Sequence, residues 1–151
     1  MWKLDHEEGY FRVYDSRRTI AGYFDPDYGP LPAGDEGQDI VDRMIRDGDP
    51  VPGGTLMVPL IKFGLFDTDL DAQISDVEAS VGGAAAQLAR WRKYLADAGG
   101  PPHSVRISHT DQDMLTISFP VYFERPVPVS PGELLGELGP ILDALQGAGL
   151  L

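Results

Sequence analysis

The chain contains no cysteine, and this absence excludes several kinds of chemistry at once. Without thiols there is no disulfide, thiolate nucleophile, iron–sulfur cluster or cysteine-ligated zinc, and the composition agrees with a reducing cytosol. No apolar run approaches the roughly 20 residues that span a bilayer. Residues 1–8 have neither the basic start nor the apolar core of a signal peptide. We therefore expect a cytoplasmic protein that is not bound to a membrane.

Basic residues are scarce as well. Twelve Lys and Arg stand against 24 Asp and Glu, which gives a net charge of -12. Such a charge opposes direct binding to a nucleic-acid backbone and favours basic protein partners, whose approach it steers. The length of 151 residues and the hydrophobic content of 42% are those of one ordinary globular domain. We predict a single domain over residues 1–151.

The N-terminal half is punctuated by proline and glycine. Residues 10–15 and 19–24 are rich in aromatic and β-branched side chains around a short polar break, which predicts a β-hairpin. Residues 25–54 form a Pro/Gly-rich insertion, in which Ile40, Val41, Met44 and Ile45 recur at the spacing of about three helical turns. Asp35 and Glu36 lie where a helix N-terminus favours negative charge. Residues 55–63 read as a strand, and Pro59 indicates an edge or a bulge.

The C-terminal half has stronger periodicity. A stripe of apolar residues predicts a long helix, and it consists of Ile74, Val77, Val81, Ala84, Leu88, Trp91 and Leu95. Apolar and polar residues alternate on both sides of 110–113, which indicates a second hairpin that extends past Pro120. Ser130 and Glu133 form a capping box for a closing leucine-rich helix, followed by a frayed tail at 147–151. The element order predicts an α+β fold: a twisted antiparallel sheet of about five strands with two or three helices packed on it.

The most specific local signal is the run 67–78. It places carboxylates Asp67, Asp69, Asp71 and Glu78 at positions one, three, five and twelve of a twelve-residue loop, as in a calcium-binding EF-hand. Ala72 stands where the sharp turn of that loop requires glycine. The same carboxylates are also explained as helix-capping residues at a strand-to-helix junction. Calcium binding is therefore an alternative hypothesis, and we expect no bound metal or other cofactor.

No catalytic constellation is evident. The serines lack a glycine-flanked nucleophile turn, and no glycine-rich loop with lysine is present to hold phosphate. The histidines, His6, His103 and His109, are far apart in the sequence, although His103 and His109 lie on either side of a predicted strand. We expect no enzyme. A small carboxylate-dependent hydrolase or isomerase is a second alternative, which requires a concave pocket and a carboxylate of raised pKa.

The C-terminal half also resembles a known family. The segment 87–95, the hairpin 105–119, the segment 126–135 and the leucine-rich closing helix are similar to the YbjN-like family, over about residues 84–147. That resemblance implies a fold like the type III secretion chaperones: a twisted antiparallel sheet with helices on one side, a homodimer, and no catalysis. The helix that opens such chaperones has no counterpart before Tyr10.

These observations lead to one functional hypothesis. We expect a non-enzymatic, chaperone-like protein-binding module, homodimeric, that engages a basic partner such as a single-stranded-DNA-binding, repair or stress-response protein. Apolar residues of the two C-terminal helices are most simply core, and any surplus would form the interface. The candidate interface residues are Trp91, Leu134, Leu138, Ile141 and Leu145.

Overall fold

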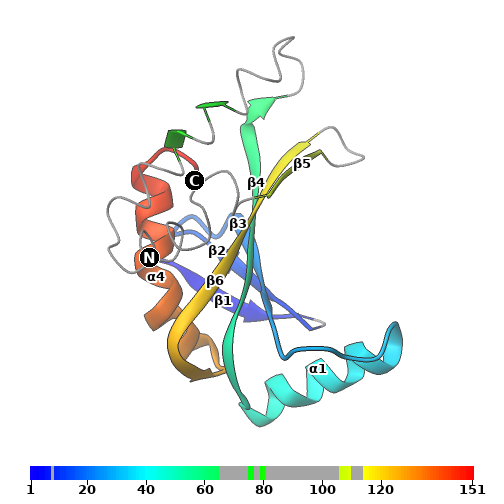
Figure 1. Cartoon of the computed structure of the whole chain (residues 1–151). Helices are drawn as coiled ribbons and strands as arrows, with labels where there is room; N and C mark the ends of the chain where they lie inside the picture. The colour runs from blue at the N-terminus through cyan, green and yellow to red at the C-terminus, as the bar shows by residue number, and fades with distance from the viewer. Residues whose placement is uncertain (8, 65–74, 77–78, 81–105, 110–113) are drawn as a thin grey trace. The chain divides into compact units, whose positions relative to one another are not determined.

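The computed structural model describes residues 1–7, 9–64, 75–76, 79–80, 106–109 and 114–151. The strands are β1 (Lys3–His6), β2 (Phe11–Tyr14), β3 (Ile20–Pro26), β4 (Pro50–Gly64), β5 (Arg106–His109) and β6 (Met114–Pro128), and the two long described helices are α1 (Asp35–Asp47) and α4 (Pro131–Gly147) (Figure 1). The strands form one sheet in the order β1-β2-β3-β4-β6-β5. The pairs β1–β2, β2–β3 and β5–β6 are antiparallel. The predicted α+β class with an antiparallel sheet is confirmed.

Two compact units make up the chain. One consists of Met1–Leu56 with Pro120–Leu138, and the other of Met57–Phe119 with Gly139–Leu151. The first unit holds β1, β2, β3 and α1 together with the first residues of β4, the last of β6 and the start of α4. Its buried apolar side chains include Phe11, Phe24 and Val121, and the rings of Phe24 and Phe123 lie 6.2 Å apart.

The first strand was not predicted. Lys3 pairs with Tyr14 and His6 with Phe11, so β1 adds an edge strand to the predicted hairpin. Only one of its four residues, Leu4, is buried. Four residues with a single buried apolar side chain are too short a pattern to predict a strand. β1 is therefore held by its backbone pairing with β2 and not by its own sequence preference.

The predicted N-terminal hairpin is confirmed as β2 and β3, paired antiparallel with a bulge between Val13 and Tyr14. Asp15 fixes the turn, because its carboxylate accepts hydrogen bonds from the backbone N–H groups of Arg17 at 2.8 Å and Thr19 at 3.0 Å. Arg18 adopts a φ of 60°, the left-handed conformation that tight turns use.

The helix predicted inside the insertion is also confirmed. It spans Asp35–Asp47 and ends at Gly48, whose φ of 69° is left-handed. The N–H of Gly48 donates to Ile45 and that of Asp49 to Met44, which is the Schellman pattern of a glycine-terminated helix. The insertion itself is shorter than predicted, because β3 continues to Pro26 and β4 begins at Pro50.

Strand β4 corrects two predictions. Gly53 and Gly54 belong to the strand rather than to a loop. Glycine is required at both positions because neighbouring strands leave no room for a Cβ. A Cβ on Gly53 would meet the carbonyl oxygen of Val121 on β6, and a Cβ on Gly54 would meet that of Asp25 on β3. Of the two interpretations of Pro59, the edge strand is wrong, because β4 lies between β3 and β6 in the sheet. The bulge stays a prediction.

The C-terminal hairpin and closing helix match the prediction. Ile107 of β5 pairs with Ile117 of β6, and β6 continues past Pro120 to Pro128. Ser130 Oγ accepts the N–H of Glu133 at 3.4 Å, as expected for the cap. The prediction of a frayed tail is wrong. Leu150 is buried and its N–H donates to Leu145, so the chain after α4 folds back onto the helix end.

The long helix predicted around 74–95 lies mostly outside the described residues. Ser75, Asp76, Ala79 and Ser80 are described and are helical.

Candidate functional site

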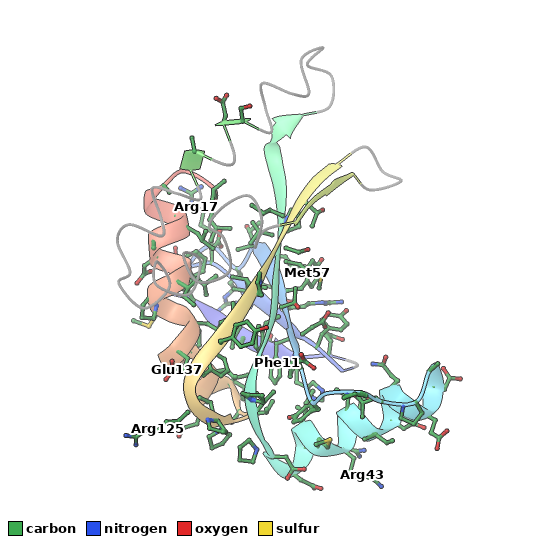
Figure 2. The ribbon with its side chains drawn as sticks, in the orientation of Figure 1. Phe11, Arg17, Arg43, Met57, Arg125 and Glu137 are labelled. Atoms are coloured by element: carbon green, nitrogen blue, oxygen red, sulfur yellow. The ribbon has the colours of Figure 1, made fainter. Side chains whose placement is uncertain are left out.

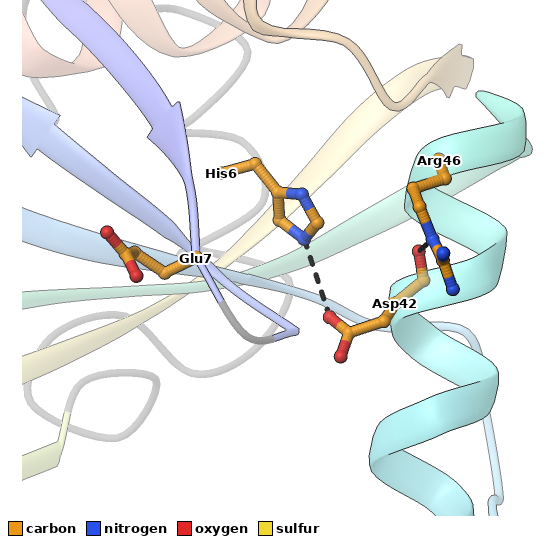
Figure 3. Close-up of a pocket in the computed structure, with 4 residues that line it drawn as sticks. All are labelled: His6, Glu7, Asp42 and Arg46. Carbon is orange, nitrogen blue, oxygen red and sulfur yellow. Dashed lines mark hydrogen bonds and ion pairs between the residues drawn. The ribbon is translucent and has the colours of Figure 1, made fainter.

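A cavity of about 410 Å³ lies between the end of β1 and one side of α1, within the first unit. Among the described residues, the side chains of His6, Glu7, Asp42 and Arg46 line it (Figure 3). All of these are polar, so this part of the cavity can hold water or a charged group.

His6 ends β1 and Glu7 follows it, whereas Asp42 and Arg46 lie on α1. On β1, His6 pairs with Phe11, and its ring packs against the Phe11 ring with centroids 5.4 Å apart. Glu7 follows His6 and points to the other side of the strand. On α1, Asp42 and Arg46 are one turn apart, and Arg46 Nε donates to the Asp42 carbonyl oxygen at 3.4 Å.

The central contact is between His6 and Asp42. The Nε2 atom of His6 lies 3.5 Å from Oδ1 of Asp42, with side chains 31% and 24% exposed. The contact becomes an ion pair when His6 is protonated. Oδ1 of Asp42 is buried and accepts no hydrogen bond from any residue that the structure describes. A buried carboxylate oxygen without a hydrogen bond costs free energy, so a donor that reached Oδ1 would be favoured.

A second cavity of about 300 Å³ shares His6 and Arg46 with the first. Its buried lining residues Phe11, Ile45 and Val129 are apolar, whereas Asp47 and Arg46 are exposed. The remaining lining residues are Gly48, Ser130 and Pro131. We call the two cavities together the His6 groove. The hydroxyl of Ser130 is already used as the cap of α4.

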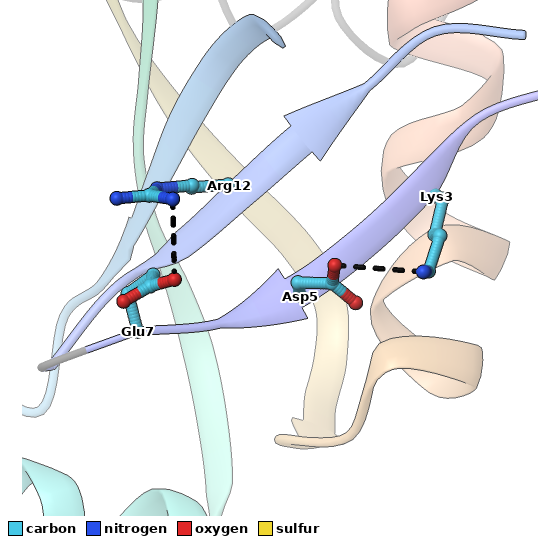
Figure 4. A network of polar contacts seen from close by, with 4 residues as sticks. All are labelled: Lys3, Asp5, Glu7 and Arg12. Carbon is cyan, nitrogen blue, oxygen red and sulfur yellow. Dashed lines mark ion pairs between the residues drawn. The ribbon is translucent and has the colours of Figure 1, made fainter. Parts of the chain in front are cut away.

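A polar network along β1 and β2 shares Glu7 with the first cavity (Figure 4). Arg12 pairs with Glu7 at 3.3 Å, and Lys3 with Asp5 at 3.5 Å. The hydroxyls of Tyr14 and Tyr10 accept hydrogen bonds from Arg12 and, with the charge of Glu7, raise the pKa of the guanidinium above its ordinary value. These exposed pairs orient the side chains and contribute little stability.

Two further groups of the first unit have shifted pKa values. Burial raises the pKa of the Asp25 carboxyl above its ordinary value. Burial, and then the charge of Asp49, raise the pKa of Tyr28 to about 12, and the Tyr28 hydroxyl donates to the Asp49 carbonyl oxygen at 3.2 Å. Neither residue lines the His6 groove. The enzyme alternative, which requires a concave pocket together with a carboxylate of raised pKa, stays a prediction.

Most of the site residues predicted from the sequence do not belong to the groove. Asp67, Asp69, Asp71 and Glu78 of the calcium loop are outside the described residues, as are Trp91 and His103. Among the residues that are described, no three His, Asp or Glu side chains form a group able to hold a metal ion. The His6 groove was not predicted, because residue 6 and residues 42–47 approach only when β1 joins the sheet, and no spacing in the sequence marks that approach.

The other candidate interface residues lie on α4. Leu134, Leu138 and Leu145 have no exposed surface, and Ile141 is 5% exposed. Their burial agrees with the interpretation of this apolar helix face as core. The subunit interface at these positions stays a prediction.

Compared with models of protein families, with curated proteins and with solved structures, the chain shows no match. The resemblance to the YbjN-like family therefore stays a prediction. Within the described residues, no helix is long and apolar enough to cross a membrane.

Proposed function

We propose that this chain is a non-enzymatic, chaperone-like protein-binding module of the cytoplasm that works as a homodimer and holds a basic segment of a partner. One observation carries the proposal. Residues 25–49 contain eight acidic and two basic residues, and the acidic side chains exposed on this segment are Asp27, Asp35, Glu36, Asp39 and Asp47. This stretch holds half of the net charge of -12.

The helix in this segment supports the proposal in a second way. Ile40, Val41 and Met44 are only half-buried, although they lie on the apolar side of α1. Arg43 lies on the outer side of the helix and points away from the strands (Figure 2). A helix that presents carboxylates beside partly exposed apolar residues suits a partner segment that is both basic and apolar.

The acidic charge acts at long range and the local contacts act at short range. Carboxylates spread over α1 raise the encounter rate with a cationic segment, and salt screens this effect over about 10 Å at 0.1 M. Release of the partner is then governed by the contacts made after docking. In this proposal the acidic charge attracts the cationic segment, and the contacts formed after docking hold it.

The first test uses a fluorescein-labelled octalysine peptide and fluorescence anisotropy. We expect the peptide to bind at about 50 mM salt and to lose at least tenfold in affinity at about 300 mM salt. An octaglutamate peptide of the same length is the control, and it should not bind. Equal behaviour of the two peptides, or no binding of octalysine at low salt, would overturn the proposed partner chemistry.

A further inference from the structure

The His6 groove combines features that fit one kind of side chain. We infer that it is the binding site for a single lysine or arginine side chain of the basic partner. The inference rests on the proposed function. The groove would bind the guest side chain through the apolar side chains of Phe11, Ile45 and Val129 and through the carboxylates of Asp42 and Asp47.

The floor of the groove matches the aliphatic part of such a side chain. Phe11, Ile45 and Val129 lie directly beneath a cavity of about 300 Å³, and the apolar surface that they leave exposed there is small, 6% of Ile45 and 2% of Val129. That volume equals about ten water molecules at about 30 Å³ each. Lysine and arginine lay their methylene stems along apolar surface of this kind while the charged end reaches a polar site.

The walls of the groove match the charged end. With His6 neutral, the described side chains that line the groove carry three negative charges, on Glu7, Asp42 and Asp47, against one positive charge on Arg46. Arg12 already pairs with Glu7, which leaves Asp42 and Asp47 on α1 as the acceptors for a guest cation. The net charge of the groove therefore favours a cation over an anion.

Asp42 gives the most specific indication of a ligand. Its Oδ1 atom is buried, and no described residue donates a hydrogen bond to it. His6 Nε2 lies 3.5 Å from this atom without forming a hydrogen bond. The Asp42 side chain is 24% exposed, so its carboxylate is within reach of an ammonium or guanidinium group in the cavity. A charge-assisted hydrogen bond of that kind is about twice as strong as a neutral one.

The test separates this groove from the general acidity of the chain. The variant Asp42→Asn with Asp47→Asn removes two charges from the groove, and Asp35→Asn with Glu36→Gln removes two exposed charges from the first turn of the same helix. We expect the groove variant to bind octalysine at least about tenfold more weakly than wild type, and the control variant less than about threefold more weakly. Equal losses would overturn the groove while leaving the proposed function intact.

Further measurements show whether a loss of binding reflects a loss of folding. Thermal unfolding of both variants is followed by circular dichroism. The wild-type chain, labelled with ¹⁵N, is titrated with octalysine, and we expect the amides of Ile45 and Gly48 and the His6 ring to shift more than the amide of Asp35. Shifts confined to the first turn of α1 would overturn the groove, whether or not the variant folds. A peptide that binds nowhere on wild type would overturn the proposed function and the groove together.

Discussion

At the scale of single residues, close backbone approaches decide which positions tolerate change. A Cβ on Gly54 would meet the carbonyl oxygen of Asp25, and the Phe24 ring would lie 2.8 Å away. In α4, by contrast, a Cβ on Gly136 would meet nothing within 4 Å. Two glycines in regular secondary structure therefore have opposite roles, the first required by packing and the second a cost to its helix.

This contrast predicts opposite effects of the same substitution. Gly54→Ala should lower the free energy of unfolding by about 1–3 kcal/mol, because β3 must shift to admit the methyl group. Gly136→Ala should raise it by about 1 kcal/mol, because alanine favours the helix. Urea denaturation of the two variants beside wild type measures both effects. A Gly54→Ala protein as stable as wild type would contradict the close approach of β3 and β4.

At the scale of elements, caps and turns explain where the segments of the first unit stop and start. Helix α1 ends at a left-handed glycine, and its two acidic residues Asp35 and Glu36 occupy the first turn. Helix α4 starts at Ser130, with Pro131 in the first helical position. These signals are local, which is why the sequence located both helices to within a few residues.

The cap of α4 gives a prediction at this scale. Ser130→Ala removes the acceptor for the Glu133 N–H and should destabilise the protein by about 1 kcal/mol. Ser130→Thr keeps a hydroxyl in the same place and should cost less. Thermal unfolding of the two variants measures the difference. Equal melting temperatures for Ser130→Ala and wild type would show that the hydroxyl contributes no stability at 3.4 Å.

At the scale of the whole molecule, net charge and assembly are the properties that the proposed function depends on. Self-repulsion from a charge of -12 keeps unrelated copies apart in solution, so a stable homodimer needs a specific interface to overcome it.

The homodimer is tested by light scattering after size exclusion. We expect twice the chain mass of 16.4 kDa, unchanged between about 1 mM calcium and a chelator. Glu78→Gln is the matched variant for the calcium alternative, and it should behave as wild type. A monomer whose elution shifts with calcium, and no longer shifts in Glu78→Gln, would contradict the proposal and favour the loop at 67–78.

The sequence by itself determined the fold class, both described helices, and the hairpins β2–β3 and β5–β6. Each of these rests on local signals: apolar periodicity, a polar turn such as the one fixed by Asp15, or a capping residue. The acidic balance behind the proposed partner is likewise a property of composition alone.

Only the tertiary structure decided the remaining features. Strand β1 has one buried residue and is held by pairing with β2, so its own sequence did not mark it. Gly53 and Gly54 read as a loop but are required where β4 passes close to its neighbours. The His6 groove joins residues about 36 positions apart, His6 and Asp42, that have no pattern in common. Each of these depends on contacts between separate segments of the chain, and the periodicity within one segment carries no information about such contacts.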